Sequence, residues 1–330
     1  MMINCIDVYN PYSNTVVTDK YFSVITSAFV SLNIKVNTIN SFLEKKSSHI
    51  VVTSIKDSIT AKKKGYKYVF LWLQGIIPEE SYLRNHSKLR KKFLSVLERR
   101  GLEASDFVFY VSNAMRNHII RKYNYNNPAY YIMPCFNDEI YKPAFYTEGK
   151  YCNNVFLYAG SLDAWQCFED TVCIYKLIEQ KVKKCSFRIL TKDQERANQI
   201  LSQYDIKNFS ISFVSPDKIG DEMKNAKFGF SIRKDDPVNR VATPTKLSTY
   251  ISYGVLPIYS ECIEGFNEIA KENKFCIKYN DESDLSHIID CCNDEIDANE
   301  VYNKIKLTFG NYYSASFHSS QIEKIIGSIV

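Results

Sequence analysis

The feature that most constrains the fold of this chain is a recurrence of short apolar runs with helical stretches between them. Several runs are apolar throughout, as expected for strands whose sheet is covered by helices on both faces. Strand–helix alternation of this kind predicts an α/β fold with doubly wound, mainly parallel sheets. The runs form two series: 3–8, 49–53, 67–73, 106–112 and 129–134, then 154–160, 186–191, 209–214, 227–232, 255–260 and 274–279.

The two series predict two domains, which also suits a length of 330 residues. The boundary lies near PCFNDEIYKPAFYTEGKY (134–151), where prolines and polar residues interrupt any hydrophobic period. We therefore expect Rossmann-like domains over residues 1–143 and 144–311, with a central cleft lined by the carboxyl ends of both sheets. A late apolar helical period predicts a C-terminal helix in residues 312–330 that packs back on the N-terminal domain.

The composition and the N-terminus of the chain bear on its cellular location. No run of about 18 uncharged apolar residues is present, and the N-terminus lacks the basic start and apolar core of a signal peptide, so we expect a cytoplasmic protein. The ten cysteines contain no CxxC pair and mostly sit in apolar surroundings, which predicts free, buried thiols in a reducing compartment.

Charge is divided unevenly along the chain. Residues 1–150 carry 21 Lys and Arg against 12 Asp and Glu, whereas residues 151–330 carry 21 against 25. The runs KKKGYK (62–67) and KLRKK (88–92) concentrate the positive charge. A basic first domain is typical of a protein that contacts an anionic surface, here the inner face of the cell membrane, although each run alone also suits a solvated helix face. Because no nucleic-acid recognition module is visible, we expect no nucleic-acid partner.

The segment NRVATPTKLSTYISYGVLPIYS (239–260) has the pattern of a ligand-binding turn. Thr243 before Pro244 predicts a helix start, with the threonine hydroxyl as N-cap. The helix then runs from Pro244 to about Tyr253, and Gly254 supplies the left-handed stop before the next strand. The N-terminus of such a helix presents free N–H groups and partial positive charge, which suit phosphate.

Cations and hydroxyl groups gather around that helix start. Arg233 ends the strand before it, and Arg240 and Lys246 flank it. Arginine binds phosphate through paired hydrogen bonds, and lysine acts as a point charge. Asn239, Thr243 and Thr245 are expected to bond sugar or phosphate oxygens. The alternative is a capped surface helix with solvated charges, but this concentration of groups between strand end and helix start favours a diphosphate site.

Residues 226–260 resemble the donor-binding segment of bacterial GT-B glycosyltransferases of the group 1, family four-like type. Three other stretches, 105–124, 134–143 and 154–165, resemble further elements of that family in the same order. The resemblance implies the GT-B fold, with two Rossmann-like domains facing a central cleft. It also implies transfer of a sugar from a nucleotide-diphosphate donor to an acceptor hydroxyl, in synthesis of a surface polysaccharide such as O-antigen or capsule.

Carried over by position, the resemblance implies that Gly160 and Ser161 approach the diphosphate. Arg233 and Lys246 would face its phosphates, and the helix start at Pro244 and Thr245 would cradle them.

The chain also departs from the family. Ser161 and Gln166 stand where many members have arginine and lysine, and Val241 and Thr249 stand where they have a pair of glutamates. Thr249 is still expected to bond a ribose hydroxyl, without charge, so neutralisation of phosphate would rest more heavily on Arg233 and its neighbouring cations.

The stretch LWLQGIIPEES (71–81) marks the acceptor side of the first domain. It leaves a strand at the ligand-binding edge, and similar glycosyltransferases carry a related stretch there. The alternative is that its acidic residues only begin a helix, where carboxylates are favoured. The loop at 9–14 occupies the corresponding edge. The residues expected to face the cleft are Asn10, Tyr12, Gln74, Gly75, Glu79 and Glu80.

The chemistry expected from these residues needs no cofactor and no metal. Asp235 and Asp236 are better explained as a solvated turn than as a metal-binding pair, and histidines are few. The resemblance implies retention of configuration, by attack from the face of the departing phosphate. In an inverting reaction Glu79 or Glu80 would act as base.

Other functions stay open at this point. One is a non-catalytic GT-B partner subunit of a glycosyltransferase, and another is a sugar-nucleotide 2-epimerase of the same architecture. A Rossmann dehydrogenase is disfavoured because no GxGxxG follows a strand. A saccharide acceptor linked to a membrane lipid fits the basic first domain best.

Overall fold

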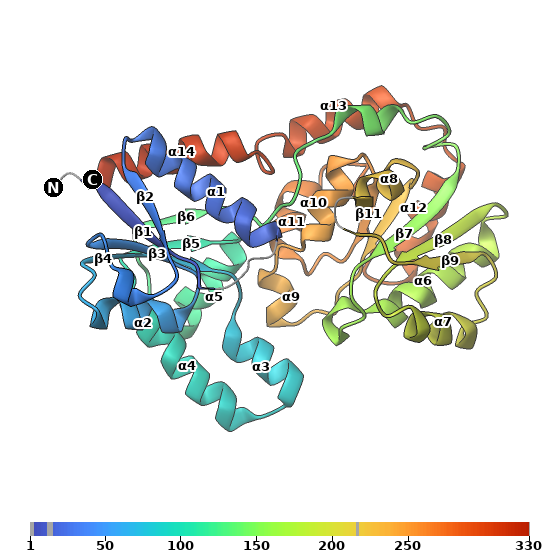
Figure 1. Ribbon diagram of the computed structural model, residues 1–330. Helices are drawn as coiled ribbons and strands as arrows, with labels where there is room; N and C mark the ends of the chain where they lie inside the picture. The colour runs from blue at the N-terminus through green and yellow to red at the C-terminus, as the bar shows by residue number, and fades with distance from the viewer. Residues whose placement is uncertain (1–2, 12–15, 216–217, 330) are drawn as a thin grey trace. The chain divides into compact units, whose positions relative to one another are not determined.

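The computed structural model describes residues 3–11, 16–215 and 218–329, and the chain divides into two compact units (Figure 1). The N-terminal unit comprises Met1–Asn137, Arg240–Thr243 and Ser314–Val330, and the C-terminal unit comprises Asp138–Asn239 and Pro244–Tyr313. The main boundary thus lies six residues before the expected one at 143. The assignment of Arg240–Thr243 to the N-terminal unit has no counterpart in the sequence analysis.

Within the described residues, the N-terminal unit contains a six-stranded parallel sheet in the order β2-β1-β3-β4-β5-β6. Its central strands are apolar and buried throughout, as the sequence pattern predicted. The strands are β1 (Cys5–Tyr9), β2 (Lys35–Ile39), β3 (His49–Val52), β4 (Tyr68–Leu73), β5 (Phe107–Tyr110) and β6 (Tyr130–Ile132).

Helices cover both faces of this sheet, with α1 and α14 on one face and α2 and α4 on the other (Figure 1). The C-terminal helix α14 packs along α1, so it belongs to the N-terminal unit. The helices are α1 (Val16–Ser31), η1 (Phe42–Glu44), α2 (Ile55–Lys63), α3 (Ile77–Asn85), α4 (Lys88–Glu103), α5 (Asn113–Tyr123) and α14 (Ala315–Ile329); α9 (Pro237–Val241) spans the division between the units.

In the part of the chain that the structure describes, the C-terminal unit has a second six-stranded parallel sheet, in the order β12-β11-β10-β7-β8-β9. Its strands are β7 (Asn154–Ala159), β8 (Cys185–Leu190), β9 (Phe209–Ser212), β10 (Phe228–Ser231), β11 (Leu256–Tyr259) and β12 (Ile277–Lys278). Its helices are η2 (Lys142–Tyr146), η3 (Ala164–Gln166), α6 (Phe168–Lys181), α7 (Gln194–Gln203), α8 (Ile219–Lys224), α10 (Thr245–Ser252), α11 (Glu264–Ala270), η5 (Glu282–Asp284), α12 (Leu285–Asn293) and α13 (Ala298–Phe309).

The order of strands creates a topological switch point in the C-terminal unit. The chain leaves β7 toward β8 on one side of the sheet and leaves β10 toward β11 on the other, while β7 and β10 are paired neighbours. Right-handed crossovers therefore place α6 and α10 on opposite faces, which opens a crevice at the carboxyl ends of β7 and β10. Ligands of open α/β sheets bind at such a crevice.

Two expectations about local structure were incomplete. The sequence analysis missed β2, because KVNTI alternates apolar and polar residues and forms a half-exposed edge strand instead of a buried one. The ten cysteines are free, as predicted, but only four are buried: Cys167, Cys185, Cys276 and Cys292.

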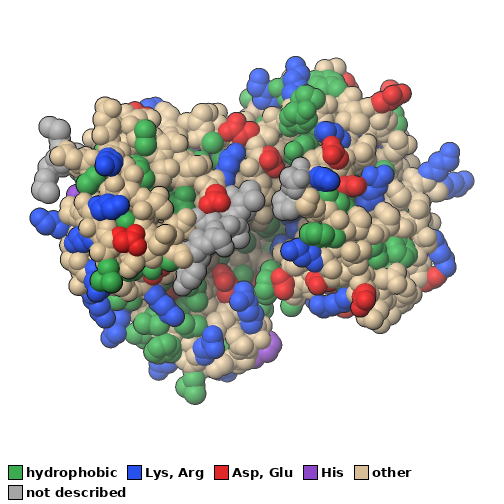
Figure 2. All heavy atoms as spheres, in the orientation of Figure 1, with side chains coloured by type: hydrophobic (Ala, Val, Ile, Leu, Met, Phe, Trp, Pro, Cys, Tyr) green, Lys and Arg blue, Asp and Glu red, His purple; other side chains and the backbone are tan. Residues whose placement is uncertain are grey.

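The two basic runs differ in how far they are paired. In the run 62–67, Lys62 lies in the last turn of α2, and its ammonium forms an ion pair of 2.6 Å with Asp106. The run 88–92 begins α4, where Lys88, Arg90 and Lys92 are exposed. Lys and Arg side chains accordingly stand out on the surface of the N-terminal unit (Figure 2).

Candidate functional site

The switch point of the C-terminal unit brings a glycine turn next to a strand end that carries an arginine. Gly160 directly follows β7, and Arg233 lies two residues beyond β10. Gly160 has a φ of +145°, a conformation that residues with a side chain rarely adopt. The turn therefore depends on glycine, and it leaves the backbone bare at the point where a ligand would approach.

Arg233 is held rigidly in this position. Its side chain is 7% exposed, and its guanidinium donates to the Gln166 side-chain oxygen at 2.7 Å and to the Gln166 carbonyl at 3.2 Å. The Ser260 hydroxyl accepts a hydrogen bond of 3.0 Å from the Arg233 backbone N–H. Burial lowers the pKa of Arg233, yet a guanidinium remains charged in proteins. The crevice thus contains a fixed positive charge.

Lys246 reaches the same point from the first turn of α10. One turn further along, the Tyr250 ring packs against Gly229 of β10, where a Cβ atom would come within 2.7 Å of the ring. The Tyr250 hydroxyl also accepts a hydrogen bond from the Ala159 N–H at 3.2 Å, which ties α10 to the end of β7. These contacts set the register of α10, so that the Lys246 ammonium lies 3.4 Å from where a Cβ of Gly160 would be.

The Lys246 ammonium is buried and has no hydrogen-bond partner among the residues that the structure describes. It lies over the Tyr158 ring, 4.2 Å from the ring centre. This cation–π contact stabilises the positive charge of Lys246. Burial lowers the pKa of Lys246 well below its usual value, and the positive charge of Arg233 lowers it further. A buried donor that is left unsatisfied costs about 1–3 kcal/mol, so this arrangement is unfavourable without a ligand.

Arg233 and Lys246, here called the cation pair, are not neutralised by the protein. Within the described residues, neither forms an ion pair with a carboxylate. Two neighbouring cations without a counter-ion, at a glycine turn and a switch point, have the charge and the donor groups that suit an anion with several oxygen atoms. The structure therefore brings together three predicted residues: Gly160, Arg233 and Lys246.

The start of α10 differs from the prediction. The N-cap is Pro244, no side chain caps the helix, and α10 begins at Thr245. The Thr243 hydroxyl instead accepts a hydrogen bond from the Cys135 N–H at 3.1 Å, and Thr243 belongs to the N-terminal unit. The prediction of a threonine N-cap was therefore wrong. Gly254 does take the left-handed conformation expected of it, with a φ of +67°.

The remaining predicted donor residues are already engaged in contacts of their own. The Asn239 amide donates to the Lys234 carbonyl at 2.9 Å and to an Asp236 carboxylate oxygen at 2.7 Å. The Thr249 hydroxyl donates to the Thr245 carbonyl at 3.2 Å, and Thr249 is 4% exposed.

Ser161 and Arg240 are exposed, in contrast to Thr249. The Ser161 hydroxyl donates to Asp163 at 2.7 Å, and Arg240 is assigned to the N-terminal unit. Donor contacts by Ser161, Asn239, Arg240 and Thr249 stay predictions.

Gln166 is the residue whose role the sequence analysis missed. It was considered only as a departure from the lysine of similar proteins, but its side-chain oxygen accepts the shortest hydrogen bond of Arg233. Its position six residues after the glycine turn is the signal that would have found it.

A cavity of about 450 Å³ adjoins Arg233 on the β10–β12 side, lined also by Ser260 and Cys262.

The N-terminal unit has a second candidate site at the carboxyl ends of β3 and β4. A cavity of about 320 Å³ there is lined by Thr53, Gln74, Gly75 and Glu80 among others, so three of the predicted acceptor-side residues share one cavity. One Glu80 carboxylate oxygen lies 2.0 Å from where a Cβ of Gly75 would be, so this glycine makes room for the carboxyl group. Burial raises the pKa of Glu80, although Arg84 partly offsets the effect.

Glu79 has a different environment from its neighbour Glu80. It is 6% exposed and forms ion pairs with Lys122 at 2.9 Å and with Lys91 at 3.6 Å. Lys122 also pairs with the buried Glu98 at 3.1 Å. This network joins α3, α4 and α5, so the geometry favours a structural role for Glu79 and leaves Glu80 as the better candidate base.

For two other predicted acceptor-side residues, Asn10 and Tyr12, the structure provides no evidence of a role. Asn10 follows β1 and donates its backbone N–H to the Ile39 carbonyl at 2.9 Å. Tyr12 lies outside the described residues.

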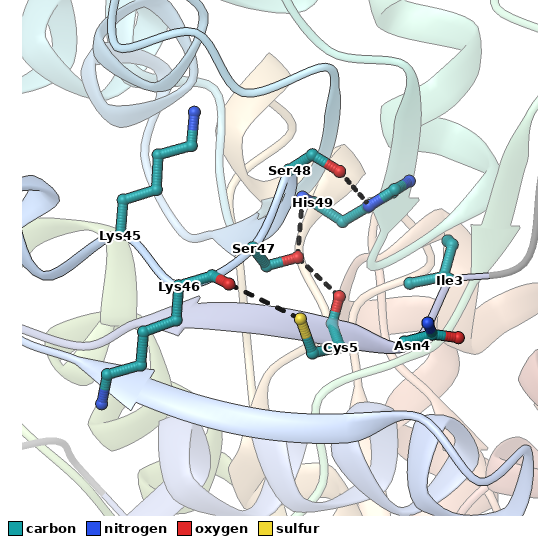
Figure 3. Close-up of a pocket in the computed structure, with 8 residues that line it drawn as sticks. All are labelled: Ile3, Asn4, Cys5, Lys45, Lys46, Ser47, Ser48 and His49. Atoms are coloured by element: carbon teal, nitrogen blue, oxygen red, sulfur yellow. Dashed lines mark hydrogen bonds between the residues drawn. The ribbon is translucent and has the colours of Figure 1, made fainter.

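The cavity in Figure 3 lies at the opposite, amino-terminal edge of the same sheet. It measures about 480 Å³ and is lined by residues 3–5 and 45–49. Its polar groups mostly bond one another: the Ser47 hydroxyl accepts from the His49 N–H at 3.0 Å, and the Ser48 hydroxyl contacts the His49 ring nitrogen at 3.0 Å. Lys45 and Lys46 point away from the other labelled side chains (Figure 3). The cavity therefore presents no converging cations.

Within the described ranges, no group of three or more His, Cys, Asp or Glu side chains is arranged to hold a metal ion. No helix among the described residues is long and apolar enough to cross a bilayer.

Comparison with known proteins identifies the architecture. No family model matches the chain, and no curated protein sequence does. Among solved structures, the lipopolysaccharide outer core galactosyltransferase WaaB matches with a TM-score of 0.67 and 13% identity, over 100% of both chains. HepE from Anabaena, in complex with UDP, matches with a TM-score of 0.69 and 12% identity, over 99% of this chain and 100% of HepE. The fold is GT-B.

A further match shows the same architecture in part of a longer protein. A mutant of TarM from S. aureus, in complex with fondaparinux, alpha-GlcNAc-glycerol and UDP, matches with a TM-score of 0.64 and 12% identity. The match covers 86% of this chain and 56% of TarM, so the chain spans just over half the length of that protein.

Proposed function

We propose that the protein is a glycosyltransferase that moves a sugar from a nucleotide-diphosphate donor to a hydroxyl of a saccharide acceptor. The observation that carries the proposal is the buried Lys246 ammonium, which lies beside Arg233 at the turn of Gly160 and has no hydrogen-bond partner in the described part of the chain. A diphosphate supplies the negative charge and the acceptor atoms that this arrangement lacks. GT-B proteins of similar structure that bind UDP support the same assignment.

The cation pair would act on the leaving group. In the transfer, the bond between the anomeric carbon and the phosphate oxygen breaks, and a bond from that carbon to the acceptor oxygen forms. The electron pair goes to the diphosphate, whose growing charge Arg233 and Lys246 stabilise from preorganised positions. Because two cations supply this stabilisation, we propose that the reaction needs no divalent metal.

The acceptor proton has two possible destinations. In a retaining transfer it goes to the departing phosphate, which requires no strong base and suits this site. In an inverting transfer it goes to a carboxylate, and Glu80 is the candidate because it lines the 320 Å³ cavity of the N-terminal unit. We favour retention, with an acceptor linked to a membrane lipid and a role in bacterial surface polysaccharide synthesis.

A second candidate function is that of a non-catalytic GT-B partner subunit. Thr249 favours this function. It stands where similar enzymes have a glutamate, and its hydroxyl is buried and bonded within α10, so no carboxylate is presented to a ribose at this position. Such a subunit would bind the nucleotide without turning it over.

The proposal is tested by incubating the purified chain with UDP-, GDP-, CDP- and dTDP-sugars, with and without a lipid-linked saccharide fraction, in the presence of EDTA. We expect release of nucleoside diphosphate from at least one donor, increased by acceptor. Lys246→Met removes a cation that would stabilise the leaving group and should reduce the release about 100- to 1,000-fold. Lys271→Met, which removes an exposed lysine of the same unit, should leave it unchanged. Binding of a nucleotide without release or transfer would indicate the partner subunit. Absence of both would contradict the donor site.

A further inference from the structure

Helix α4 carries an apolar stripe on its solvent face. Leu89 is 84% exposed, Phe93 is 64% exposed and Val96 is 48% exposed. At about 100° per residue, these three positions lie within roughly 60° of one another around the helix axis. The side of α4 that faces its own unit instead buries Glu98, Gly101 and Leu102. Leu89, Phe93 and Val96 thus point into solvent, whereas Leu102 is buried against the rest of the unit.

Basic side chains border this stripe. Lys92 and Arg99 lie on one side of it, Arg90 lies on the other, and Arg100 continues the stripe by one turn. All four are exposed. The one exposed carboxylate that the structure describes on α4, Glu103, is paired with Arg99 at 2.9 Å. Figure 2 shows hydrophobic side chains beside Lys and Arg over the region where Figure 1 draws α4.

We propose that this face of α4, formed by Leu89, Phe93 and Val96 with their basic border, docks on an anionic lipid bilayer. An apolar stripe flanked by Lys and Arg is the arrangement that lies in the headgroup region, with apolar side chains inserted and cations at the phosphates. A second copy of the same face is disfavoured because its cations would oppose those of the first. The inference rests on the proposed transfer to a lipid-linked acceptor and names the surface that would meet the membrane.

The position of α4 within its unit connects this face to the acceptor-side cavity. α4 packs along α3, and the ion pair of 3.6 Å between Lys91 and Glu79 joins the two helices. α3 carries Glu80, which lines the cavity at the carboxyl ends of β3 and β4. A bilayer in contact with α4 would therefore present its headgroups to the same unit that holds this cavity.

Sedimentation with liposomes tests the docking face. Vesicles of phosphatidylcholine mixed with phosphatidylglycerol, which is anionic, are compared with vesicles of phosphatidylcholine alone. We expect binding to the anionic vesicles that weakens in 0.5 M NaCl, a concentration at which the screening length falls to about 4 Å. The double variant Leu89→Ser/Phe93→Ser should weaken binding about ten- to a hundredfold. Leu307→Ser removes an equally exposed leucine, 82% exposed, from the C-terminal unit and should change nothing.

Charge variants and two further measurements complete the test. Arg90→Gln/Lys92→Gln should lower binding about fivefold for each charge removed, while Lys183→Gln/Lys184→Gln, in an exposed pair of the other unit, should not. Nucleotide binding, followed by thermal shift, should be the same in every α4 variant, which separates this proposal from the donor site. Equal binding of all variants to vesicles would overturn the inference. So would a concentration-dependent dimer in sedimentation velocity that the α4 variants abolish, because the face would then be an interface between copies.

Discussion

Replacement of Lys246 by methionine should make the unliganded protein more stable and, at the same time, impair its binding of nucleotide. Methionine keeps the length and the apolar stem of lysine but removes a buried ammonium that lies next to Arg233 and lacks a hydrogen-bond partner within the described ranges. The unsatisfied donor alone costs about 1–3 kcal/mol. In a unit of this size, each kcal/mol gained corresponds to a rise in Tm of about 2–4 °C.

The gain in stability should depend on pH in a defined direction. The pKa of Lys246 is lowered in the folded protein, so the unfolded chain binds more protons between the folded pKa and the ordinary value near 10.5. Stability of the wild type therefore rises with pH across that window. The advantage of Lys246→Met should be greatest below the folded pKa and should shrink as the pH approaches about 10.5.

Nucleotide binding by Lys246→Met should be weakened, whereas the stability of the unliganded protein increases. A charge-assisted hydrogen bond to a phosphate is worth about 1.5–3 kcal/mol, so the variant should bind nucleoside diphosphate about 10- to 150-fold more weakly. Melting curves at pH 6, 7.5 and 9, together with calorimetric titration of the nucleotide, measure both effects. A variant that is less stable than the wild type, yet binds nucleotide equally well, would refute the reasoning, because Lys246 would then be a structural residue.

Three further predictions concern single residues. Gly160→Ala should lower the free energy of unfolding by about 1–3 kcal/mol and weaken nucleotide binding, since φ is +145° there; denaturant titration and calorimetry report the two effects. Lys150 has its pKa lowered by burial to about 7, so the wild type should gain stability relative to Lys150→Met between pH 7 and pH 9, by at most about 2.7 kcal/mol; denaturant titration at both pH values measures the gain. Glu79→Gln should destabilise the protein by about 1–3 kcal/mol without slowing transfer, because it weakens the buried contact with Lys122. Glu80→Gln should leave the rate nearly unchanged in the retaining reaction that we favour and should slow an inverting one; unfolding and rate measurements on both variants distinguish the two.

The architecture was predictable because buried parallel strands leave a continuous apolar signal. Among the residues that the structure describes, all six strands of the C-terminal unit correspond to predicted runs, and the central strands β7, β10 and β11 show this signal most clearly. The meeting of Arg233 with Lys246 was also foreseeable, since strand ends and the following helix starts lie at the same edge of such a sheet. The edge strand β2 escaped because its exposure removes the apolar signal.

Partners that come from distant parts of the chain could not be predicted. The Thr243 hydroxyl bonds to Cys135, more than a hundred residues away, instead of capping α10. Glu79 looks like an acidic residue in a helix start, but the partner that fixes its role, Lys122, belongs to α5. A local pattern identifies a residue that suits a helix start or a ligand, and tertiary contacts decide whether the side chain is still available for it.

The account depends on the cation pair binding a diphosphate, and calorimetric titration of the wild-type chain tests this directly. UDP, GDP, CDP and dTDP are titrated beside the corresponding nucleoside monophosphates. We expect at least one diphosphate to bind about tenfold or more tightly than its monophosphate, because the second phosphate reaches a charge that the first does not. Equal affinity for both, or no binding of any nucleotide, would contradict the account.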